Sequence, residues 1–211
     1  NLPQKVRRRE ASVDPVQKVL DSMSLEEKVG QLMVIGFGGS SLTQPEKERI
    51  ERIRPGGLIL FSRNVETPEQ LIGLTTELQS NAKVPYFIAT DQEGGVINRV
   101  TFSGVVMPGA MAMGAADSKE LARKVGRATG EQLASLGINM NFAPVLDVNN
   151  NPMNPVIGIR SFGEDPELVA RLGVEYIKGL QDAGVMSAAK HFPGHGDTSV
   201  DSHLDLPKVD F

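Results

Sequence analysis

The sequence predicts an α/β fold built on a parallel sheet, and within that class the first five units of a (β/α)₈ barrel. Short and almost continuously apolar runs alternate with amphipathic stretches, a pattern typical of strands buried between helices. Polar residues follow directly after four of these runs, at 62–64, 91–93, 147–149 and 190–191. A barrel brings all such positions to one mouth. The alternative is an open doubly wound sheet, but no Gly-x-Gly-x-x-Gly motif follows the first predicted strand.

The elements are justified in chain order by periodicity and capping. A first helix is expected over residues 14–27, because Pro15 suits a first turn and apolar residues recur at helical spacing. Ser24 and Glu27 form a capping-box pattern that opens a further short turn. Thr67 is expected to cap a later helix. Five strands are predicted at 29–37, 57–61, 86–90, 139–148 and 185–190, and the helices between them at 45–54, 68–81, 118–136 and 166–183.

Composition narrows the possible classes of protein. The chain has 211 residues, enough for one domain, and its formal net charge of −4 argues against an electrostatic nucleic-acid binder. No apolar run approaches the roughly 18 residues of a transmembrane helix. The absence of cysteine excludes disulfides, thiolate zinc sites and a cysteine nucleophile within this chain. Residues 1–14 are polar and basic, and we expect them to form a flexible tail ahead of a domain at 15–211.

All three histidines of the chain lie within thirteen residues, after the last predicted strand. His191, His195 and His203 share this segment with Asp197 and Asp201. A carboxylate two residues from an imidazole can fix its tautomer, which suits general acid–base catalysis. The alternatives are a metal site, although the glycines and proline forbid helical ligand spacing, and a purely structural role in anchoring a long loop.

A second group of candidates follows the third and fourth predicted strands. Asp91 could accept hydrogen bonds from sugar hydroxyls, bind a metal, or serve only as a helix cap or ion-pair partner. Arg99 and Arg160, each taken alone, are typical of surface ion pairs. Glu164 and Asp165 precede a proline, which indicates a helix N-terminus rather than a reactive group.

Residues 190–198 (KHFPGHGDT) and 201–203 (DSH) resemble the signature of family 3 glycoside hydrolases, and within it the bacterial β-N-acetylglucosaminidase branch. The resemblance extends over nearly everything after about residue 15, including 23–33 (MSLEEKVGQLM), 56–61, 91–95, 141–151 (NFAPVLDVNNN) and 155–162. The Asp-Ser-His extension is the part that separates this branch from the β-glucosidases of the family.

The resemblance implies a retaining glycosidase that needs no metal or other cofactor. It implies that His203 is the general acid/base and Asp201 its partner. The family's nucleophile is an aspartate on a later strand, and no residue here matches it. Asp147 and Asp197 therefore receive no role, and no nucleophile is assigned. The residues implied to bind a terminal N-acetylglucosamine are Asp91, Arg99, Arg160, Lys190 and His191.

Five strands cannot close a barrel, so we expect this chain to be one piece of a protein whose remainder supplies the other units. Alone it should be inactive and poorly stable.

The resemblance implies N-acetylglucosamine-containing peptidoglycan fragments (muropeptides) as substrates. The alternatives are a family 3 β-glucosidase, a broad β-hexosaminidase, or a non-catalytic sugar-binding fragment. The basic tail is similar to a region after an export signal, so an extracellular or cell-surface location is expected, with the cytoplasm as the alternative.

Overall fold

The computed structural model describes residues 14–102 and 104–208. Five strands form one parallel sheet, in which spatial order follows chain order from β1 to β5. An order without reversal has no topological switch point, as in a barrel rather than a doubly wound sheet. The predicted α/β class and the five parallel strands are thus confirmed. The strands are β1 (Val34–Ile35), β2 (Gly57–Leu60), β3 (Phe87–Thr90), β4 (Met140–Asn141) and β5 (Met186–Ser187).

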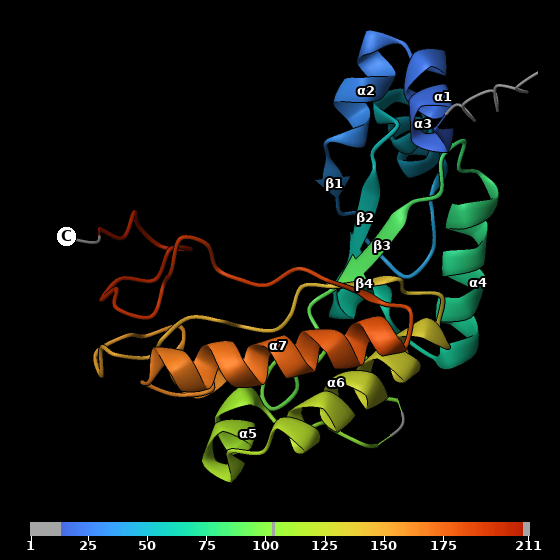
Figure 1. Cartoon of the computed structure of the whole chain (residues 1–211). Coiled ribbons are helices and arrows are strands. Elements are labelled where there is room, and N and C mark those ends of the chain that lie inside the picture. The colour runs from blue at the N-terminus through green and yellow to red at the C-terminus, as the bar shows by residue number, and fades with distance from the viewer. Residues whose placement is uncertain (1–13, 103, 209–211) are drawn as a thin grey trace, which may run out of the picture.

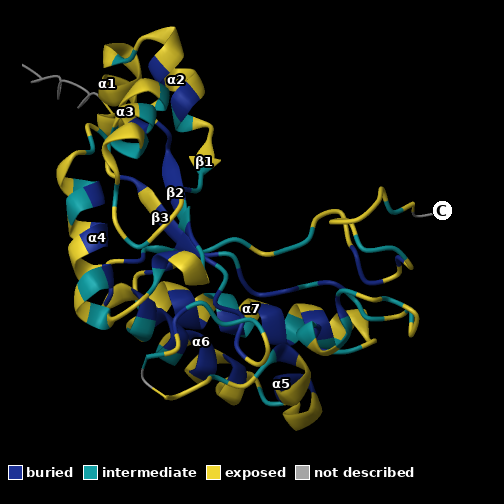
Figure 2. Ribbon diagram, turned by 180° about the vertical axis from the view of Figure 1, so that it is seen from behind, coloured by how far each residue is buried: buried dark blue, intermediate teal, exposed yellow. Residues whose placement is uncertain are grey.

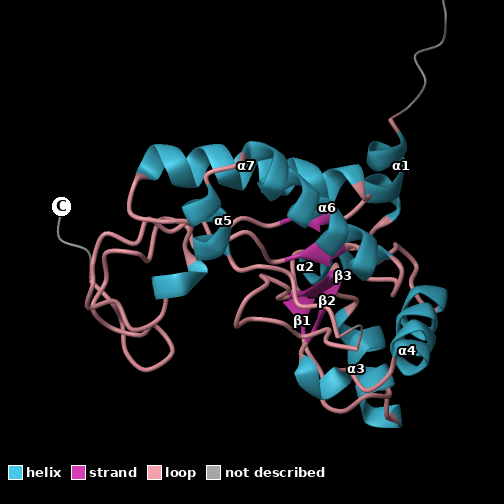
Figure 3. Cartoon of the chain, turned by 90° about the horizontal axis from the view of Figure 1, so that it is seen from below, coloured by secondary structure: helices cyan, strands magenta, loops and turns pink. Residues whose placement is uncertain are grey.

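Helices flank the sheet on several sides. Figure 1 shows the first three helices at one end of the sheet and the fourth beside it. Figure 3 shows the last two helices side by side, beyond the end of the sheet that lies opposite β1. The helices are α1 (Pro15–Ser22), α2 (Leu25–Gln31), α3 (Gln44–Ile53), α4 (Pro68–Ser80), α5 (Ala110–Ala116), α6 (Lys119–Ala134) and α7 (Pro166–Asp182), with short 3₁₀ turns η1 (Ser62–Asn64) and η2 (Gly158–Arg160).

The N-terminal part differs from the expectation in its element boundaries. The helix expected over 14–27 is two helices, because Ser24 adopts an extended conformation and begins α2 with the predicted capping box. Its hydroxyl accepts from the amide of Glu27, and the Glu27 carboxylate accepts from the amide of Ser24. The strand expected from residue 29 therefore starts only at Val34. Of the predicted tail, residues 1–13 lie outside the described residues, and Asp14 caps α1.

Two further differences concern the second half. The strands predicted at 139–148 and 185–190 are shorter, although an isolated parallel bridge between Val145 and Lys190 continues their pairing toward the site. Helix α5 was not expected, since its sequence AMAMGAA has neither a capping side chain nor charges that mark a surface helix. Asp165 caps α7, as its position before Pro166 indicated.

The core lies between the sheet and its helices, as the dark ribbon of Figure 2 shows. Leu58, Leu60 and Ile88 of the sheet are fully buried. Helices α6 and α7 pack closely enough that a Cβ on Gly179 would overlap the backbone of Arg123. Helix α6 leads into β4 and α7 leads into β5, so this packed pair directly precedes the last two strands of the sheet.

Within the described residues, each outer strand of the sheet pairs on one side only. Beside β1, large apolar side chains face solvent, with Leu32 at 87% exposure. The sheet is therefore open at this edge, and its apolar surroundings resemble a face normally covered by protein. The exposed apolar residues on this side are Leu25, Val29, Leu32, Met33 and Val34.

Candidate active site

The loop after β3 is folded back on itself by a buried glutamine. The Gln92 Oε1 atom accepts hydrogen bonds from the amides of Arg99 and Val100, and its Nε2 donates to the Val100 carbonyl. Asn141 of β4 exchanges two hydrogen bonds with the Gln92 backbone. These bonds tie the loop to the neighbouring strand and bring Arg99 next to Asp91 at the end of β3.

The structure gathers four predicted sugar-binding residues around a carboxylate that the sequence reasoning missed. Lys190 Nζ donates to Asp91 Oδ1 at 2.8 Å and to Glu93 Oε1 at 2.6 Å. The guanidinium of Arg160 donates to both oxygens of Glu93, at 2.9 and 2.8 Å. Arg99 Nη2 lies 4.0 Å from Asp91 Oδ2. We call Asp91, Glu93, Arg99, Arg160 and Lys190 the charged cluster.

The charged cluster contains two carboxylates and three cations. Burial raises the pKa of the Glu93 carboxyl, but hydrogen bonds and positive charge from Arg160 and Lys190 outweigh it and hold that pKa below its usual range. Hydrogen bonding to the Glu93 carboxylate in turn raises the pKa of the Arg160 guanidinium. In the described part of the chain, the buried Nε of Arg99 has no hydrogen-bond partner. The rest of the Arg99 guanidinium, on a side chain that is 29% exposed, can donate to a neutral ligand rich in oxygen.

His191, the fifth predicted sugar-binding residue, is held by a different carboxylate. Its Nδ1 lies 2.6 Å from Oδ2 of Asp147, whose side chain is fully buried. The other Asp147 oxygen accepts from the amides of His195 at 2.7 Å and His191 at 3.3 Å. Burial raises the pKa of Asp147, but hydrogen bonds from the His191 ring and the His195 amide outweigh burial and hold that pKa below its usual range. The group is therefore anionic at neutral pH.

Asp201 and His203 form a local pair. Both the amide and the ring Nδ1 of His203 donate to Asp201 Oδ1, at 2.9 and 2.7 Å. The amide hydrogen bond, and then the ring hydrogen bond, lower the pKa of Asp201. A carboxylate that accepts from Nδ1 leaves Nε2 of His203 available for proton exchange.

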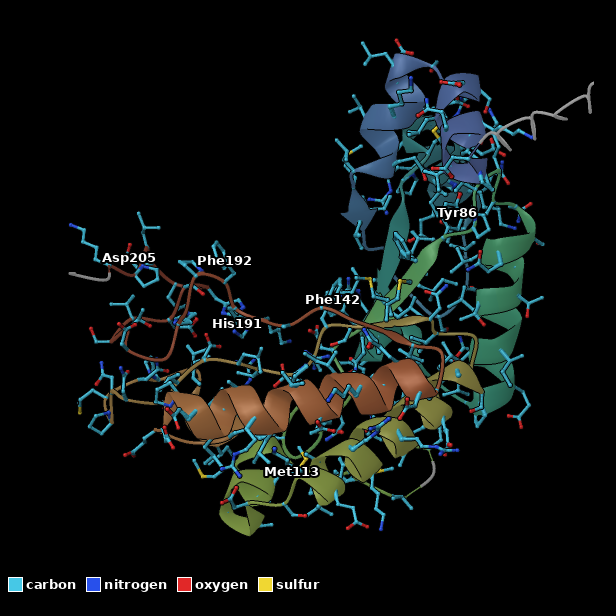
Figure 4. All side chains as sticks on the ribbon, viewed as in Figure 1. Tyr86, Met113, Phe142, His191, Phe192 and Asp205 are labelled. Carbon is cyan, nitrogen blue, oxygen red and sulfur yellow. The ribbon has the colours of Figure 1, made fainter. Side chains whose placement is uncertain are left out.

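The segment that carries this pair leads away from the sheet beside the loop after β4 (Figure 1). Figure 4 shows Asp205 at its outer end and His191 nearer the strands. Asn154 joins the two loops, because its Nδ2 donates to the carbonyls of His195 at 2.6 Å and Thr198 at 3.0 Å. Among the described residues, no hydrogen bond or ion pair connects the Asp201–His203 pair with the charged cluster.

A small cavity lies where the loops after β4 and β5 meet. It measures about 270 Å³ and is lined in part by Asp147, Lys190, His191 and Phe192.

Over residues 14–102 and 104–208, no three His, Asp or Glu residues gather closely enough to hold a metal ion. In the same ranges, none of the helices combines the length and the apolar character that a membrane span requires.

Comparison with known proteins agrees with the resemblance. Residues 24–211 match the model of the glycosyl hydrolase family 3 N-terminal domain. Beta-hexosaminidase A of Pseudoalteromonas piscicida is 51% identical over 172 residues, which are 77% of this chain and 29% of that protein. A beta-hexosaminidase of Alkalilimnicola ehrlichii is 39% identical over 85% of this chain and 53% of its own length.

The solved structures give the same picture. A family 3 β-N-acetylglucosaminidase from Paenibacillus sp. str. FPU-7 superimposes with a TM-score of 0.86 at 50% identity, over 89% of this chain and 36% of that one. NagZ from Neisseria gonorrhoeae gives 0.74 at 39% identity, over 83% and 53%. The chain therefore spans about half or less of the length of these relatives. It belongs to glycoside hydrolase family 3.

Proposed function

We propose that this chain supplies the sugar-binding part of a β-N-acetylhexosaminidase that removes terminal, non-reducing β-linked N-acetylglucosamine. The observation that carries the proposal is the charged cluster at the carboxyl ends of β3 and β5, the mouth at which barrel enzymes bind substrate. Asp91 can accept from sugar hydroxyl groups, and Arg99 can donate to hydroxyl and carbonyl oxygens. The two relatives named beta-hexosaminidase above share 39% and 51% identity with this chain.

In this proposal His203 is the general acid/base and Asp201 its partner. The Asp201 carboxylate keeps the proton on Nδ1 at 2.7 Å, so the outer nitrogen can give a proton to the glycosidic oxygen and later take one from water. The mechanism is retaining: a carboxylate attacks the anomeric carbon, and water releases the covalent intermediate. We place that nucleophile outside this chain.

The remaining units of the barrel complete the site. Two observations support this. The apolar edge beside β1 is exposed, with Leu32 at 87% and Leu25 at 72%. The cavity next to His191, at about 270 Å³, is smaller than the roughly 300–1,000 Å³ typical of ligand pockets. Further β/α units would cover the edge and enlarge the pocket. We call this chain together with those units the complete protein.

The aglycone and the location are finer proposals that rest on the family. We propose N-acetylglucosaminyl muropeptides from peptidoglycan as substrates, and an extracellular or cell-surface site of action. Digestion of purified muropeptides, compared with chitobiose, tests the first. Fractionation of cells that produce the tagged complete protein tests the second.

The activity is tested by release of p-nitrophenol from its β-N-acetylglucosaminide and from its β-glucoside. We expect the complete protein to cleave the first and to show little activity on the second. His203→Ala and Asp201→Asn should each lower kcat about 10²- to 10⁴-fold, the usual contribution of a general acid/base. Asp205→Asn, an exposed acid on the same loop, is the matched control and should resemble the wild type. Sugar binding without hydrolysis would contradict the proposal.

A further inference from the structure

Asp147 is a buried carboxylate that joins the two histidine-bearing parts of the C-terminal segment. Its side chain has 0% exposure, and among the described residues no Lys or Arg forms an ion pair with it. Instead it accepts hydrogen bonds from the His191 ring, the His191 amide and the His195 amide. Burying an anion costs free energy unless such hydrogen bonds satisfy it. The presence of the Asp147 carboxylate in this buried position therefore needs an explanation other than packing.

The first consequence concerns the tautomer of His191. An ionised carboxylate only accepts hydrogen bonds, so at 2.6 Å from Asp147 Oδ2 the Nδ1 atom of His191 carries the proton. In the neutral ring Nε2 is then an acceptor. Such an acceptor suits a sugar hydroxyl, which donates.

The second consequence concerns the loop with Asp201 and His203. Asp147 Oδ1 also fixes the His195 amide at 2.7 Å. The His195 ring in turn places Nε2 3.0 Å from the hydroxyl of Ser202, which lies between the two members of the pair. Gly196 sits against the loop after β4 so closely that a Cβ would overlap the Val148 carbonyl. The chain of contacts therefore runs from Asp147 through His195 to the pair.

We propose that Asp147 is a positioning residue that sets the tautomer of His191 for sugar binding and anchors, through His195, the loop that carries the acid/base pair. This inference rests on the proposed function. Asp147 itself touches no substrate in this account, and it acts only through the histidines it holds.

The test is Asp147→Asn in the complete protein. The two backbone amides keep the asparagine oxygen at the Oδ1 position, so its NH₂ group replaces Oδ2 and faces His191 Nδ1. The amide would donate to Nδ1 and move the ring proton to Nε2. ¹⁵N NMR of the histidine side chains, with the His191 signals assigned from their loss in His191→Gln, reports this switch.

Kinetics separate the two roles of Asp147. We expect kcat/KM of Asp147→Asn to fall about 10- to 100-fold, the effect of losing a hydrogen bond to a charged group. Part of this fall should be a rise in KM, because the His191 ring is misprotonated, and His191→Gln should show the same rise. Asp147→Asn should also lower kcat, and this second effect measures the anchoring of the loop through His195. Asp197→Asn, an exposed acid on the same loop, is the matched control and should change neither quantity.

The outcomes are distinct. A wild-type His191 ring protonated at Nε2 rather than Nδ1 would overturn the proposal, even if Asp147→Asn did not fold. So would an Asp147→Asn variant with unchanged tautomer and kinetics. A complete protein that lacks hexosaminidase activity would refute the proposed function alone, since the tautomer of His191 would still decide whether Asp147 sets the ring.

Discussion

Removal of the Glu93 carboxylate should destabilise the protein far more than removal of a surface carboxylate. The Glu93 side chain is only 6% exposed, and it binds Arg160, at 14%, and Lys190, at 16%. Glu93→Ala would leave both cations largely buried without this partner. Lys190 would retain Asp91, whereas within residues 14–102 and 104–208 the Arg160 guanidinium would keep a single hydrogen bond, to the Val156 carbonyl at 3.2 Å.

The expected magnitude follows from burial. Breaking a buried ion pair on one side costs about 3–5 kcal/mol, because the remaining charge is not compensated. Glu93→Gln retains the shape and one acceptor oxygen, and we expect about 1.5–3 kcal/mol, the value of a hydrogen bond to a charged group. Glu131→Gln is the matched control. It breaks an i,i+4 pair with Arg127, at 57% and 62% exposure, and solvent screens such a pair so well that we expect little change in stability.

Urea denaturation of the complete protein, followed by far-ultraviolet circular dichroism, measures these differences. The pH dependence gives a second readout. The folded-state pKa of Glu93 lies below its ordinary value of 4.5, so its contribution is present above that pH and is lost as pH falls through the lowered pKa. The difference in the free energy of unfolding between wild type and Glu93→Gln should therefore be largest at neutral pH and should shrink in acid.

A result equal to that of Glu131→Gln would refute this reasoning. It would mean that water reaches Arg160 and Lys190 in the folded protein and replaces the carboxylate. A stability difference that stayed constant down to strongly acidic pH would contradict its electrostatic origin. It would mean instead that the Glu93 side chain stabilises the protein through packing.

Two further predictions concern stability. Gly179→Ala should lower stability by about 1–3 kcal/mol through overpacking of α6 against α7, whereas Gly73→Ala, at an open position of α4, should raise it by about 0.5–1 kcal/mol; differential scanning calorimetry of both variants checks the sign. Glu27 has a pKa of about 2, because Lys83 and the Ser24 amide donate to it, so its contribution is present above pH 4.5 and should disappear as pH falls toward 2. Melting curves of Glu27→Gln against wild type across that range test it, and a gap that widened in acid would contradict it.

Local signals were predictable from the sequence because they involve neighbours in the chain. The capping box at Ser24 and the helix cap at Asp165 each rest on residues within three positions of each other. The apolar runs likewise identified all five parallel strands. Their lengths were overestimated, since an apolar residue on a helix that faces an open edge, such as Val29, has the same appearance in sequence as one on a strand.

The site depended on contacts that no local pattern reveals. Glu93 meets Arg160 across 67 residues, and Asp147 meets His191 across 44. Sequence reasoning noted the DQEGG segment but chose Asp91 alone. In an extended chain, residues two apart share a face, and this was the available signal for Glu93. For Asp147 the signal was weaker: an acid that follows an apolar strand and has no helix to cap.

The two parts of the proposed site are built differently, and this difference should be visible in kinetics. The charged cluster is largely buried at the carboxyl ends of the strands, and it is held by ion pairs and by Gln92 in the loop after β3. The acid/base pair lies on an exposed loop, with the His203 side chain at 79% exposure, and depends on Ser202 for its link to His195. In the proposed function Asp91 contacts the bound sugar in both ground and transition states, so its substitution should raise KM. His203 is proposed to transfer a proton only in the transition state, so its substitution should lower kcat instead. If both substitutions changed the same constant, the division of labour between the sheet and the loop inferred from their burial would be wrong.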